Sequence, residues 1–405
     1  MKILIISNLY PPHYLGGYEI LCAQVVESFI RSGHEITVLT SNFTSSASPS
    51  SVQTSEKVHG NSEQRPEQII RKLTLYPDFG KPPVIDRMMR LSQTRHNRNL
   101  TREIIAKGNF DAIFIWSQLR LSIGCAAAAE ESGIKVFYTF NDEHIIGYKP
   151  AEFSLYPIKL LKYLRDRYIF QDITFENLKF QRTTCISATL KNNLLRQGLK
   201  IPDSKVIFQG IPVENFPCKE NSGEIHSPLK LLYAGQLHEY KGVHVLLEAA
   251  AKLVKIRQLK LNITIAGDGP AEYKSTLNKL AKDCACPVEF CGRLPHSELP
   301  ALYRNNDIFI FPSLWQEPFG LTHLEAMASG TPVVSTNDGG HGEFLKNHEN
   351  SLIFEKGNSD QLADCIFELV SNDTLRSEII KTARNLIDKT FSIERYAQDL
   401  LLFIS

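Results

Sequence analysis

The sequence predicts an α/β protein made of two Rossmann-like domains, each with a parallel sheet covered by helices on both faces. Short runs of Ile, Val, Leu and Phe recur along the chain, and each is followed by a turn and an amphipathic stretch. This pattern restarts after a polar linker at 217–229. With 405 residues, the chain is long enough for two facing domains and a cleft between them.

The first domain is predicted to span 1–216. Its first strand, Lys2–Ser7, leads through a Gly-Gly turn into a helix from about Tyr18 to Arg31, which Gly33 ends. The later apolar runs are near-continuous, as expected for strands buried on both faces. They lie at Glu35–Thr40, Asp111–Trp116, Lys135–Phe140, Thr183–Ile186 and Lys205–Phe208.

The second domain is predicted to span 230–385 and to alternate strands with helices in the same way. The expected strands are Lys230–Ala234, Lys260–Ala266, Val288–Cys291, Asp307–Phe311, Pro332–Ser335 and Ser351–Phe354, and the expected helices are Val243–Lys255, Ala271–Cys284, Ser297–Arg304 and Leu321–Ser329. The remaining segment, 386–405, contains a terminal helix at Ile393–Ile404, which we expect to pack back on the first domain.

The segment Ser41–Gln64 differs from its surroundings because it is rich in Ser, Thr, Asn and Gln and has few large apolar residues. Such a composition predicts a mobile loop or a disordered insertion. It follows the carboxyl end of a strand, where α/β sheets place their ligands, so a lid over an acceptor is the alternative to plain disorder.

The overall charge points to no particular partner, since the formal net charge is +1 and the charged fraction is 22%. Two stretches are nevertheless basic: 65–102 has nine Lys and Arg against three Asp and Glu, and 149–205 has eleven against five. They are either solvated faces or surfaces for an anionic acceptor or a membrane. The segment Tyr156–Arg167 fits either a membrane contact or an amphipathic helix packed on the fold. Nothing indicates a nucleic-acid partner.

The apolar run at Met1–Ile6 is too short for a secretory signal, and no stretch approaches the roughly 18 apolar residues that span a bilayer. These observations predict a cytoplasmic protein, with the inner face of the membrane as an alternative site. The eight Cys are irregularly spaced and fit free thiols in a reducing compartment. Cys284, Cys286 and Cys291 do not match zinc-ligand spacing, so no metal site is expected.

The richest stretch for chemistry runs from Asp307 to Gly340, where a strand, a loop, a helix and a strand follow one another. The backbone N–H groups of Phe319, Gly320 and Leu321 open the helix, where unpaired amides and the helix dipole favour an anion. Glu317 before the helix and Glu325 within it each offer two acceptor oxygens, which suit vicinal sugar hydroxyls. A solvated helix-end charge is the alternative reading for either Glu alone.

Glu317 and Glu325 form an E-x7-E pair, and the residues around them closely resemble the donor-site signature of the family-4 retaining glycosyltransferases, which have the GT-B fold. The resemblance is strongest from about Leu231 to Leu352. It implies that Glu325 holds the nucleotide ribose and that Glu317 contacts the donor sugar. It also implies that the amides of Phe319, Gly320 and Leu321 bind sugar or phosphate.

The loop from Gly235 to Gly242 is similar to the family's diphosphate clamp of one Arg and one Lys. Lys241 matches the Lys and is expected to act in catalysis, whereas Gln236 stands where the family has Arg and brings no charge. Arg304 is one candidate to compensate. Arg293 and Leu294 resemble the turn that seats the nucleotide base, with Arg293 stacking on it.

In the first domain, Gly16 and Gly17 resemble the family's first glycine loop, which lets the backbone approach the donor phosphate or the acceptor. Asn141 and Asp142 stand where family members commonly carry His-Asp near the donor sugar, so we expect catalytic roles for both. His144 lies two residues beyond and is a weaker candidate for the same site.

The resemblance implies a metal-independent transfer of a sugar from a UDP- or GDP-type nucleotide sugar to a glycan, glycolipid or small-molecule hydroxyl, as in surface-polysaccharide synthesis. It implies no cofactor besides the donor, and the chain has no Asp-x-Asp pair for a metal. Two alternatives stay open. One is a partner subunit that binds nucleotide sugars without turnover, and the other is a GT-B-like nucleotide-sugar epimerase.

Overall fold

A computed structural model describes residues 1–14, 16–43, 67–76, 83–220 and 223–405. The chain divides into two compact units, which we describe separately. Unit 1 comprises Met1–Ile186, Leu190–Ile207 and Ala397–Ser405, and unit 2 comprises Ser187–Thr189 and Phe208–Tyr396. Most of the predicted insertion, from residue 44 onward, lies outside the described residues, and so do two residues of the predicted linker.

Unit 1 contains a seven-stranded parallel sheet in the order β3-β2-β1-β4-β5-β6-β7. The strand order reverses at β1, which pairs with β2 on one side and with β4 on the other. The central strands are buried on both faces, which explains their continuous apolar sequences. The strands are β1 (Lys2–Ile6), β2 (Glu35–Ser41), β3 (Gln68–Leu73), β4 (Ala112–Ile115), β5 (Lys135–Phe140), β6 (Thr183–Cys185) and β7 (Lys205–Val206).

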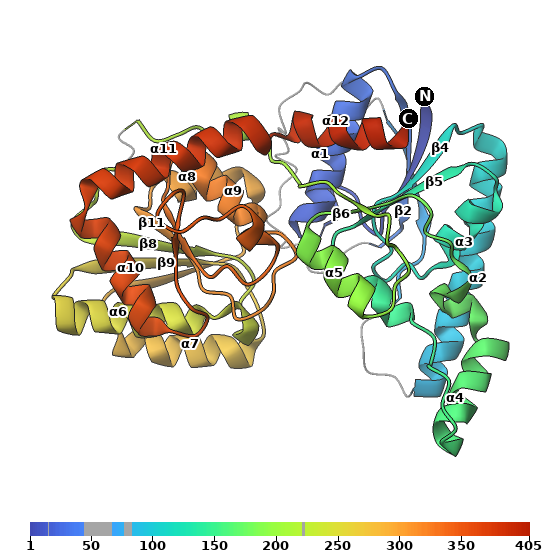
Figure 1. Cartoon of the computed structure of the whole chain (residues 1–405), viewed down its shortest axis with the longest axis horizontal. Coiled ribbons are helices and arrows are strands. Elements are labelled where there is room, and N and C mark those ends of the chain that lie inside the picture. Colours follow the sequence, from blue (N-terminus) through green and yellow to red (C-terminus); the bar gives the residue numbers. More distant parts are fainter. Residues whose placement is uncertain (15, 44–66, 77–82, 221–222) are drawn as a thin grey trace. The chain divides into compact units, whose positions relative to one another are not determined.

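Helices cover both faces of this sheet, with α1 on one side and the packed pair α2 and α3 on the other (Figure 1). The last helix, α12, belongs to unit 1 from Ala397 onward, and Phe403 packs edge-on against Phe137 of β5 at 5.4 Å between ring centroids. The helices of unit 1 are α1 (Gly17–Arg31), α2 (Pro83–Gly108), α3 (Gly124–Glu131), α4 (Pro157–Tyr168), α5 (Ala188–Arg196) and α12 (Ile393–Ile404).

Unit 2 contains a six-stranded parallel sheet in the order β10-β9-β8-β11-β12-β13. Its order reverses at β8, which pairs with β9 and with β11. The strands are β8 (Leu229–Ala234), β9 (Leu261–Ala266), β10 (Val288–Gly292), β11 (Ile308–Phe311), β12 (Val333–Ser335) and β13 (Leu352–Ile353).

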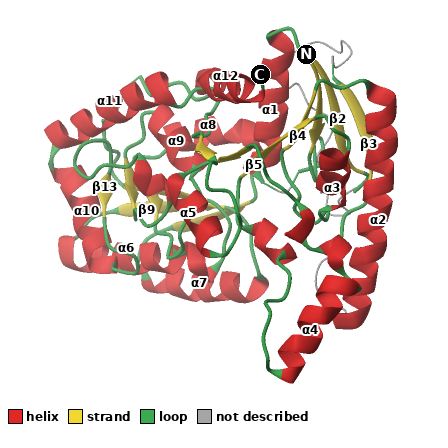
Figure 2. Cartoon of the chain, turned by 45° about the vertical axis from the view of Figure 1, so that its right-hand side comes forward, coloured by secondary structure: helices red, strands yellow, loops and turns green. Residues whose placement is uncertain are grey.

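The helices α6, α7 and α10 lie on one face of this sheet, and α8, α9 and α11 lie on the other (Figures 1 and 2). Two of them begin at asparagine caps: Asn358 Oδ1 accepts the N–H of Gln361 at 3.1 Å, and Asn372 Oδ1 accepts that of Leu375 at 3.0 Å. The helices are α6 (Val243–Arg257), α7 (Ala271–Asp283), α8 (Leu299–Arg304), α9 (Leu321–Ala328), α10 (Ser359–Ser371) and α11 (Asp373–Thr390).

The predicted fold class is confirmed, since both units are parallel sheets covered by helices on both faces. Nearly all predicted strands and helices occur within two residues of their expected bounds. Six further elements had no predicted bounds, namely β3, α2, α3, α5, α10 and α11. The main division between the units falls at 207/208, whereas the predicted first domain ends at 216.

Candidate functional site

The candidate site in unit 2 lies where two neighbouring strands end in loops. β8 and β11 are adjacent in the sheet, although they are far apart in the sequence, because the strand order reverses there. The loop after β8 carries Gln236 and Lys241, and the loop after β11 carries Glu317. In open α/β sheets this reversal leaves a crevice at the carboxyl ends of the strands, which is where ligands bind.

Lys241 and Glu317, both predicted from the sequence, are ion-paired. Lys241 Nζ lies 2.7 Å from Glu317 Oε1 and 2.8 Å from Oε2. Only 13% of the Lys241 side chain and 8% of the Glu317 side chain are exposed, so the pair is largely withdrawn from water. Ser313 Oγ donates a further hydrogen bond to Glu317 Oε1 at 2.7 Å. The carboxylate is therefore held by three hydrogen bonds.

Glycines hold these two loops in place. Gly242, just after Lys241, has φ +69°, and a Cβ there would lie 1.9 Å from the carbonyl oxygen of Pro312. Gly339 has φ +147°, and a Cβ there would lie 2.6 Å from both the N and O atoms of Glu317. The N–H of Gly340 donates to the Glu317 carbonyl at 2.7 Å. The loop after β12 thus fixes the backbone of Glu317.

The start of α9 presents backbone amides beside this pair. His323 N–H is bonded to Gly320 O at 3.1 Å, and the amides of Gly320 and Leu321 precede it, where helix geometry provides no intrahelical acceptor. Phe319 contributes only backbone to this edge, because its ring is buried. That ring packs in a cluster with Phe208, Phe344 and Phe391.

Glu325 lies on the same helix and is fully engaged by neighbouring side chains. Tyr303 Oη donates to Glu325 Oε2 at 2.8 Å, and His296 Nε2 lies 3.3 Å from Oε1. Burial lowers the pKa of His296, but the hydrogen bond and the charge of Glu325 raise it by more, so its net pKa is raised. Neither contact was predicted, because Tyr303 and His296 precede Glu325 by more than 20 positions.

Two buried histidines stack behind the start of α9. The ring centroids of His323 and His341 are 5.0 Å apart and the ring planes differ by 17°. His323 Nε2 lies 2.9 Å from Ser335 Oγ at the end of β12. Burial lowers the pKa of both rings, and their mutual repulsion lowers that of His323 further. These shifts favour the neutral form of both rings, which pack beneath Gly320.

The other predicted donor contacts of unit 2 lie in exposed loops. Gln236 is exposed after β8, and its carbonyl accepts the Tyr233 hydroxyl at 2.7 Å. Arg293 is exposed and Leu294 half-buried in the turn after β10. Arg304 does not compensate for Gln236, because the last turn of α8 precedes β11 and so lies at the opposite edge of the sheet.

In unit 1, Gly16 and Gly17 lie at the start of α1, as the glycine loop predicts. Gly16 caps the helix, and its N–H donates to Glu19 Oε2 at 2.8 Å. Glu19 was not among the predicted site residues. Burial raises its pKa, and backbone hydrogen bonds from this turn oppose that rise. Its signal was its place in the first helical turn, three residues after the capping glycine.

Asn141 and Asp142 follow β5 and line a small cavity of about 30 Å³ together with His144. The residues after β4 form its other wall, and Asn141 Nδ2 donates to Trp116 O at 3.0 Å. Asp142 Oδ1 accepts the N–H of His144 at 2.9 Å. Burial raises the pKa of Asp142, and His144 partly offsets that effect. The structure therefore places the weaker candidate, His144, beside the two expected residues.

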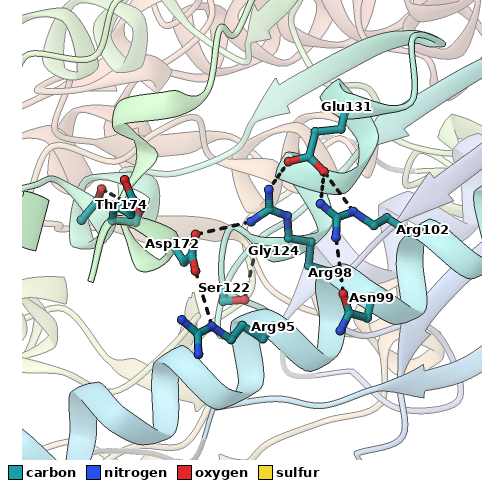
Figure 3. Close-up of polar contacts among 10 residues, drawn as sticks. Arg95, Arg98, Asn99, Arg102, Ser122, Gly124, Glu131, Asp172 and Thr174 are labelled. Carbon is teal, nitrogen blue, oxygen red and sulfur yellow. Dashed lines mark hydrogen bonds and ion pairs between the residues drawn. The ribbon is translucent and has the colours of Figure 1, made fainter. Parts of the chain in front are cut away.

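The basic stretch on α2 is largely neutralised within unit 1. Figure 3 shows Arg95, Arg98 and Arg102 directed toward two carboxylates, Asp172 and Glu131. Arg102 Nε lies 3.0 Å from Glu131 Oε2, and Arg95 Nε lies 3.5 Å from Asp172 Oδ2. These cations tie α2 to α3 and to the segment after α4, so they serve structure.

The clustered cysteines of unit 2, Cys284, Cys286 and Cys291, are free thiols. Cys284 is buried and its thiol donates to Leu247 O at 3.1 Å. Across the described part of the chain, no group of three or more His, Cys, Asp or Glu side chains is arranged to hold a metal ion. Nor does any helix there combine the length and the apolar character needed to cross a bilayer.

Comparison with protein families gives two matches that together span most of the chain. Residues 15–215 match the model of Glycosyltransferase Family 4, and residues 218–386 match that of Glycosyl transferases group 1. An uncharacterized glycosyltransferase of Methanocaldococcus jannaschii is 24% identical over 98% of this chain and 96% of its own length.

Spore coat protein SA of Bacillus subtilis is 27% identical over 49% of this chain. The matched segments of this and two further curated relatives cover 57% to 60% of their length. The crystal structure of HepE from Anabaena in complex with UDP-glucose has the same fold, with a TM-score of 0.69, 19% identity and coverage of 99% of this chain and 98% of HepE. By its two family matches and its fold, the chain belongs to the family-4-type glycosyltransferases with the GT-B fold.

Proposed function

We propose that this protein transfers a sugar from a nucleoside-diphosphate sugar to a hydroxyl acceptor, with retention of the anomeric configuration. The observation that carries the proposal is the placement of Lys241 and Glu317 side by side at the ends of β8 and β11, next to the first amides of α9. One cation, one carboxylate and a helix start meet there, and these groups suit a sugar diphosphate.

Donor binding is proposed to change the partner of Lys241. Lys241 is already neutralised by Glu317, so a diphosphate gains its full attraction only by replacing the carboxylate as the partner of Nζ. We propose this exchange: Lys241 turns to the diphosphate, and Glu317, still held by Ser313, accepts hydrogen bonds from the sugar hydroxyls. The two negative charges of the diphosphate offset the loss of the original pair.

The proposed transfer is a single displacement on one face of the sugar. The bond between the anomeric carbon and the diphosphate oxygen breaks, and its electron pair leaves with the nucleoside diphosphate. The acceptor oxygen bonds to the same face, and its proton passes to the departing phosphate oxygen. Lys241 and the α9 amides stabilise the negative charge that develops on the leaving group. In unit 1, Asn141 and Asp142 are proposed to contact the sugar.

We propose a UDP- or GDP-type donor and no further cofactor. HepE, which shares the fold, was crystallised with UDP-glucose. Glu325 is proposed to hold the ribose diol, and the turn at Arg293 and Leu294 to seat the base. The acceptor is proposed to be a glycan, a glycolipid or a small molecule, and the cytoplasm, with contact at the inner face of the membrane, is the proposed location.

The ribose role of Glu325 provides the first test. Glu325→Ala should weaken the binding of UDP or GDP about ten- to a hundredfold, because charge-assisted hydrogen bonds contribute about 1.5–3 kcal/mol. Calorimetry with both nucleotides measures this, and Glu272→Ala on α7 is a matched control at an exposed Glu of the same unit. Unchanged affinity in a folded Glu325→Ala protein would exclude the role.

Two further measurements test the reaction itself. The anomeric configuration of the product, read by proton NMR, should equal that of the donor, and an inverted product would rule out retention. Lys241 and the α9 amides supply the positive charge, so we propose that no divalent metal is needed. Complete loss of activity in chelator, restored by added metal, would overturn that point.

A binding subunit without turnover is the second candidate, and Gln236 favours it, because the diphosphate clamp lacks its second cation. Hydrolysis of the donor without acceptor distinguishes the two. A transferase releases free sugar slowly from its donor, whereas a binder leaves the nucleotide sugar intact.

A further inference from the structure

The helix α4 in unit 1 exposes the side chains that a packed helix would bury. Of the fifteen large apolar side chains exposed among the described residues, eight lie within 153–169. Six of these eight lie on α4 or beside its ends, with exposures from 39% to 82%: Leu155, Ile158, Leu161, Leu164, Tyr168 and Ile169. A surface helix of a globular protein normally turns its apolar stripe toward the core. We call these six residues the α4 apolar face.

Ion pairs connect α4 to the rest of unit 1. Asp166 is buried, lies 2.9 Å from an Arg165 guanidinium nitrogen and pairs with Arg87 of α2. Arg167 pairs with Glu176 at 2.9 Å. A cavity of about 320 Å³, bordered by Tyr163 and Phe175 among others, lies behind the helix. The inner contacts of α4 thus combine these ion pairs with the half-buried Leu160 and Tyr163, while most of its large apolar side chains are exposed.

The exposed charge around the α4 apolar face is positive. The helix contains four cations, Lys159, Lys162, Arg165 and Arg167, and a single acid, Asp166, which is buried and paired. Lys159 and Lys162 are exposed. This differs from α2, where Arg98 and Arg102 share the carboxylate of Glu131 (Figure 3). Figures 1 and 2 both draw α4 away from the sheet of unit 1, beside the first turns of α2.

We propose that α4 docks on the surface of an anionic lipid bilayer. Its apolar face would enter the boundary between headgroups and acyl chains, while Lys159 and Lys162 contact lipid phosphates. An exposed apolar face with lysines and arginines at its border is what binds helices in the plane of a membrane surface. A second copy of the chain fits less well, because two α4 helices would bring like charges together. The inference rests on the location given in the proposed function and deepens it, since it names the helix and the lipid chemistry that would hold the enzyme at the membrane.

Flotation of the full chain with lipid vesicles tests this. The protein should float with vesicles of phosphatidylcholine and phosphatidylglycerol, and much less with phosphatidylcholine alone. Ile158→Ser with Leu161→Ser should lower the partition coefficient about tenfold or more, since two apolar side chains are lost from the bilayer. Lys159→Glu with Lys162→Glu should lower it about tenfold or more and weaken its dependence on salt.

Matched controls come from unit 2. Ile256→Ser on α6 removes an equally exposed Ile, and Lys279→Glu with Lys282→Glu on α7 reverses two exposed charges; both should float like wild type. The proposal is overturned if wild type stays unbound by anionic vesicles, or if the α4 variants float unchanged. Sedimentation velocity without lipid tests the alternative. If wild type is a dimer and the Leu161→Ser variant is a monomer, the α4 apolar face binds a second copy of the chain instead.

Binding of UDP or GDP by the same variants, followed by calorimetry, should be unchanged. This measurement separates a failure of membrane docking from a failure of the proposed donor site.

Discussion

Lys241 Nζ lies almost equally far from both carboxylate oxygens of Glu317, at 2.7 and 2.8 Å, although 76 positions separate the two residues in the chain. Aromatic rings lie around the ammonium group, with the centroid of Trp315 at 5.3 Å and that of Phe311 at 5.9 Å. Because both charged groups are largely buried, each is stabilised mainly by its attraction to the other. Removal of either one leaves an uncompensated charge in a poorly solvated place.

Lys241→Ala should therefore change two quantities. We expect kcat to fall about a hundredfold or more, because the ammonium would stabilise the leaving diphosphate in the transition state. We also expect the free energy of unfolding to fall by about 3–5 kcal/mol, the usual loss when one partner of a buried pair is removed. Steady-state kinetics and urea denaturation measure these changes.

A second substitution separates the two effects. Lys241→Ala with Glu317→Gln should recover part of the lost stability, because the stranded carboxylate is gone, and should leave kcat low. Lys274→Ala is the control, since that lysine pairs with Asp268 on the surface. A normal kcat with only a raised KM in Lys241→Ala would mean that Lys241 binds the ground state alone.

Gln236→Arg tests whether a second cation beside Lys241 improves the proposed diphosphate site. The side chain of Gln236 is exposed at the end of β8, so the larger Arg has room. A second cation near the leaving group should raise kcat/KM, or leave it unchanged if the guanidinium stays in water. The single variant and the pair with Lys241→Ala are compared by steady-state kinetics. A large drop in kcat/KM in a stably folded Gln236→Arg protein would show that the amide itself is required.

The stretch around this site was the most predictable part of the molecule. β11, α9 and β12 follow from an apolar run, a glycine and a proline, which act locally and can be read from neighbouring residues. Lys241 and Glu317 could be expected at one edge because strand ends carry ligands. Their direct pairing could not be predicted, because it requires β8 and β11 to be neighbours in the sheet. The local sequence does not determine the order of the strands.

Gly320→Ala should destabilise unit 2 through the backbone. Gly320 has φ +120°, and a Cβ there would lie 2.6 Å from His323 Nδ1. We expect the free energy of unfolding to fall by about 1–3 kcal/mol or more, and nucleotide binding to weaken with it. Gly33→Ala is the matched control, because Gly33 has φ +82° with no atom within 4 Å of the added carbon. Gly33→Ala should lower the free energy of unfolding by about 1 kcal/mol. Equal losses in the two variants would contradict the crowding beneath α9.

His296 should give unit 2 a pH-dependent stability. Burial lowers its pKa, but Glu325 raises it by more, so the folded-state pKa lies above the unfolded value of about 6.5. The stabilisation is then fully present below about pH 6.5 and is lost as the pH rises through the folded-state pKa. The difference in unfolding free energy between wild type and His296→Gln, followed by urea denaturation across this range, should shrink as the pH rises.

Glu325→Gln provides the control, because only the burial effect remains and the pKa of His296 should then fall below its usual value. The pH dependence that His296 gives to the free energy of unfolding should then reverse, with stability lost as the pH falls below about 6.5. If wild type and Glu325→Gln show the same pH dependence, Glu325 does not set the pKa of His296.

The polar partners of the site were the least predictable. Tyr303 and Glu325 meet because α8 and α9 pack on the same face of the sheet, and a tyrosine in a short helix gives no local sign of that contact. The long basic run in α2 was equally ambiguous. Arg95, Arg98 and Arg102 turned out to be bound to carboxylates from α3 and from the segment after α4, and only the folded chain brings those groups together.

The placement of α12 has a consequence for dividing or recombining the protein. Residues from Ala397 onward belong to unit 1, where Phe403 packs on Phe137 and the ammonium of Lys205 lies 5.6 Å from the centre of its ring. A single cut near residue 207 therefore does not yield an intact first unit. A chimera that exchanges unit 2 for the matching unit of a relative must keep the tail from the same parent as unit 1, so the chain is best treated as an insertion of one module into another.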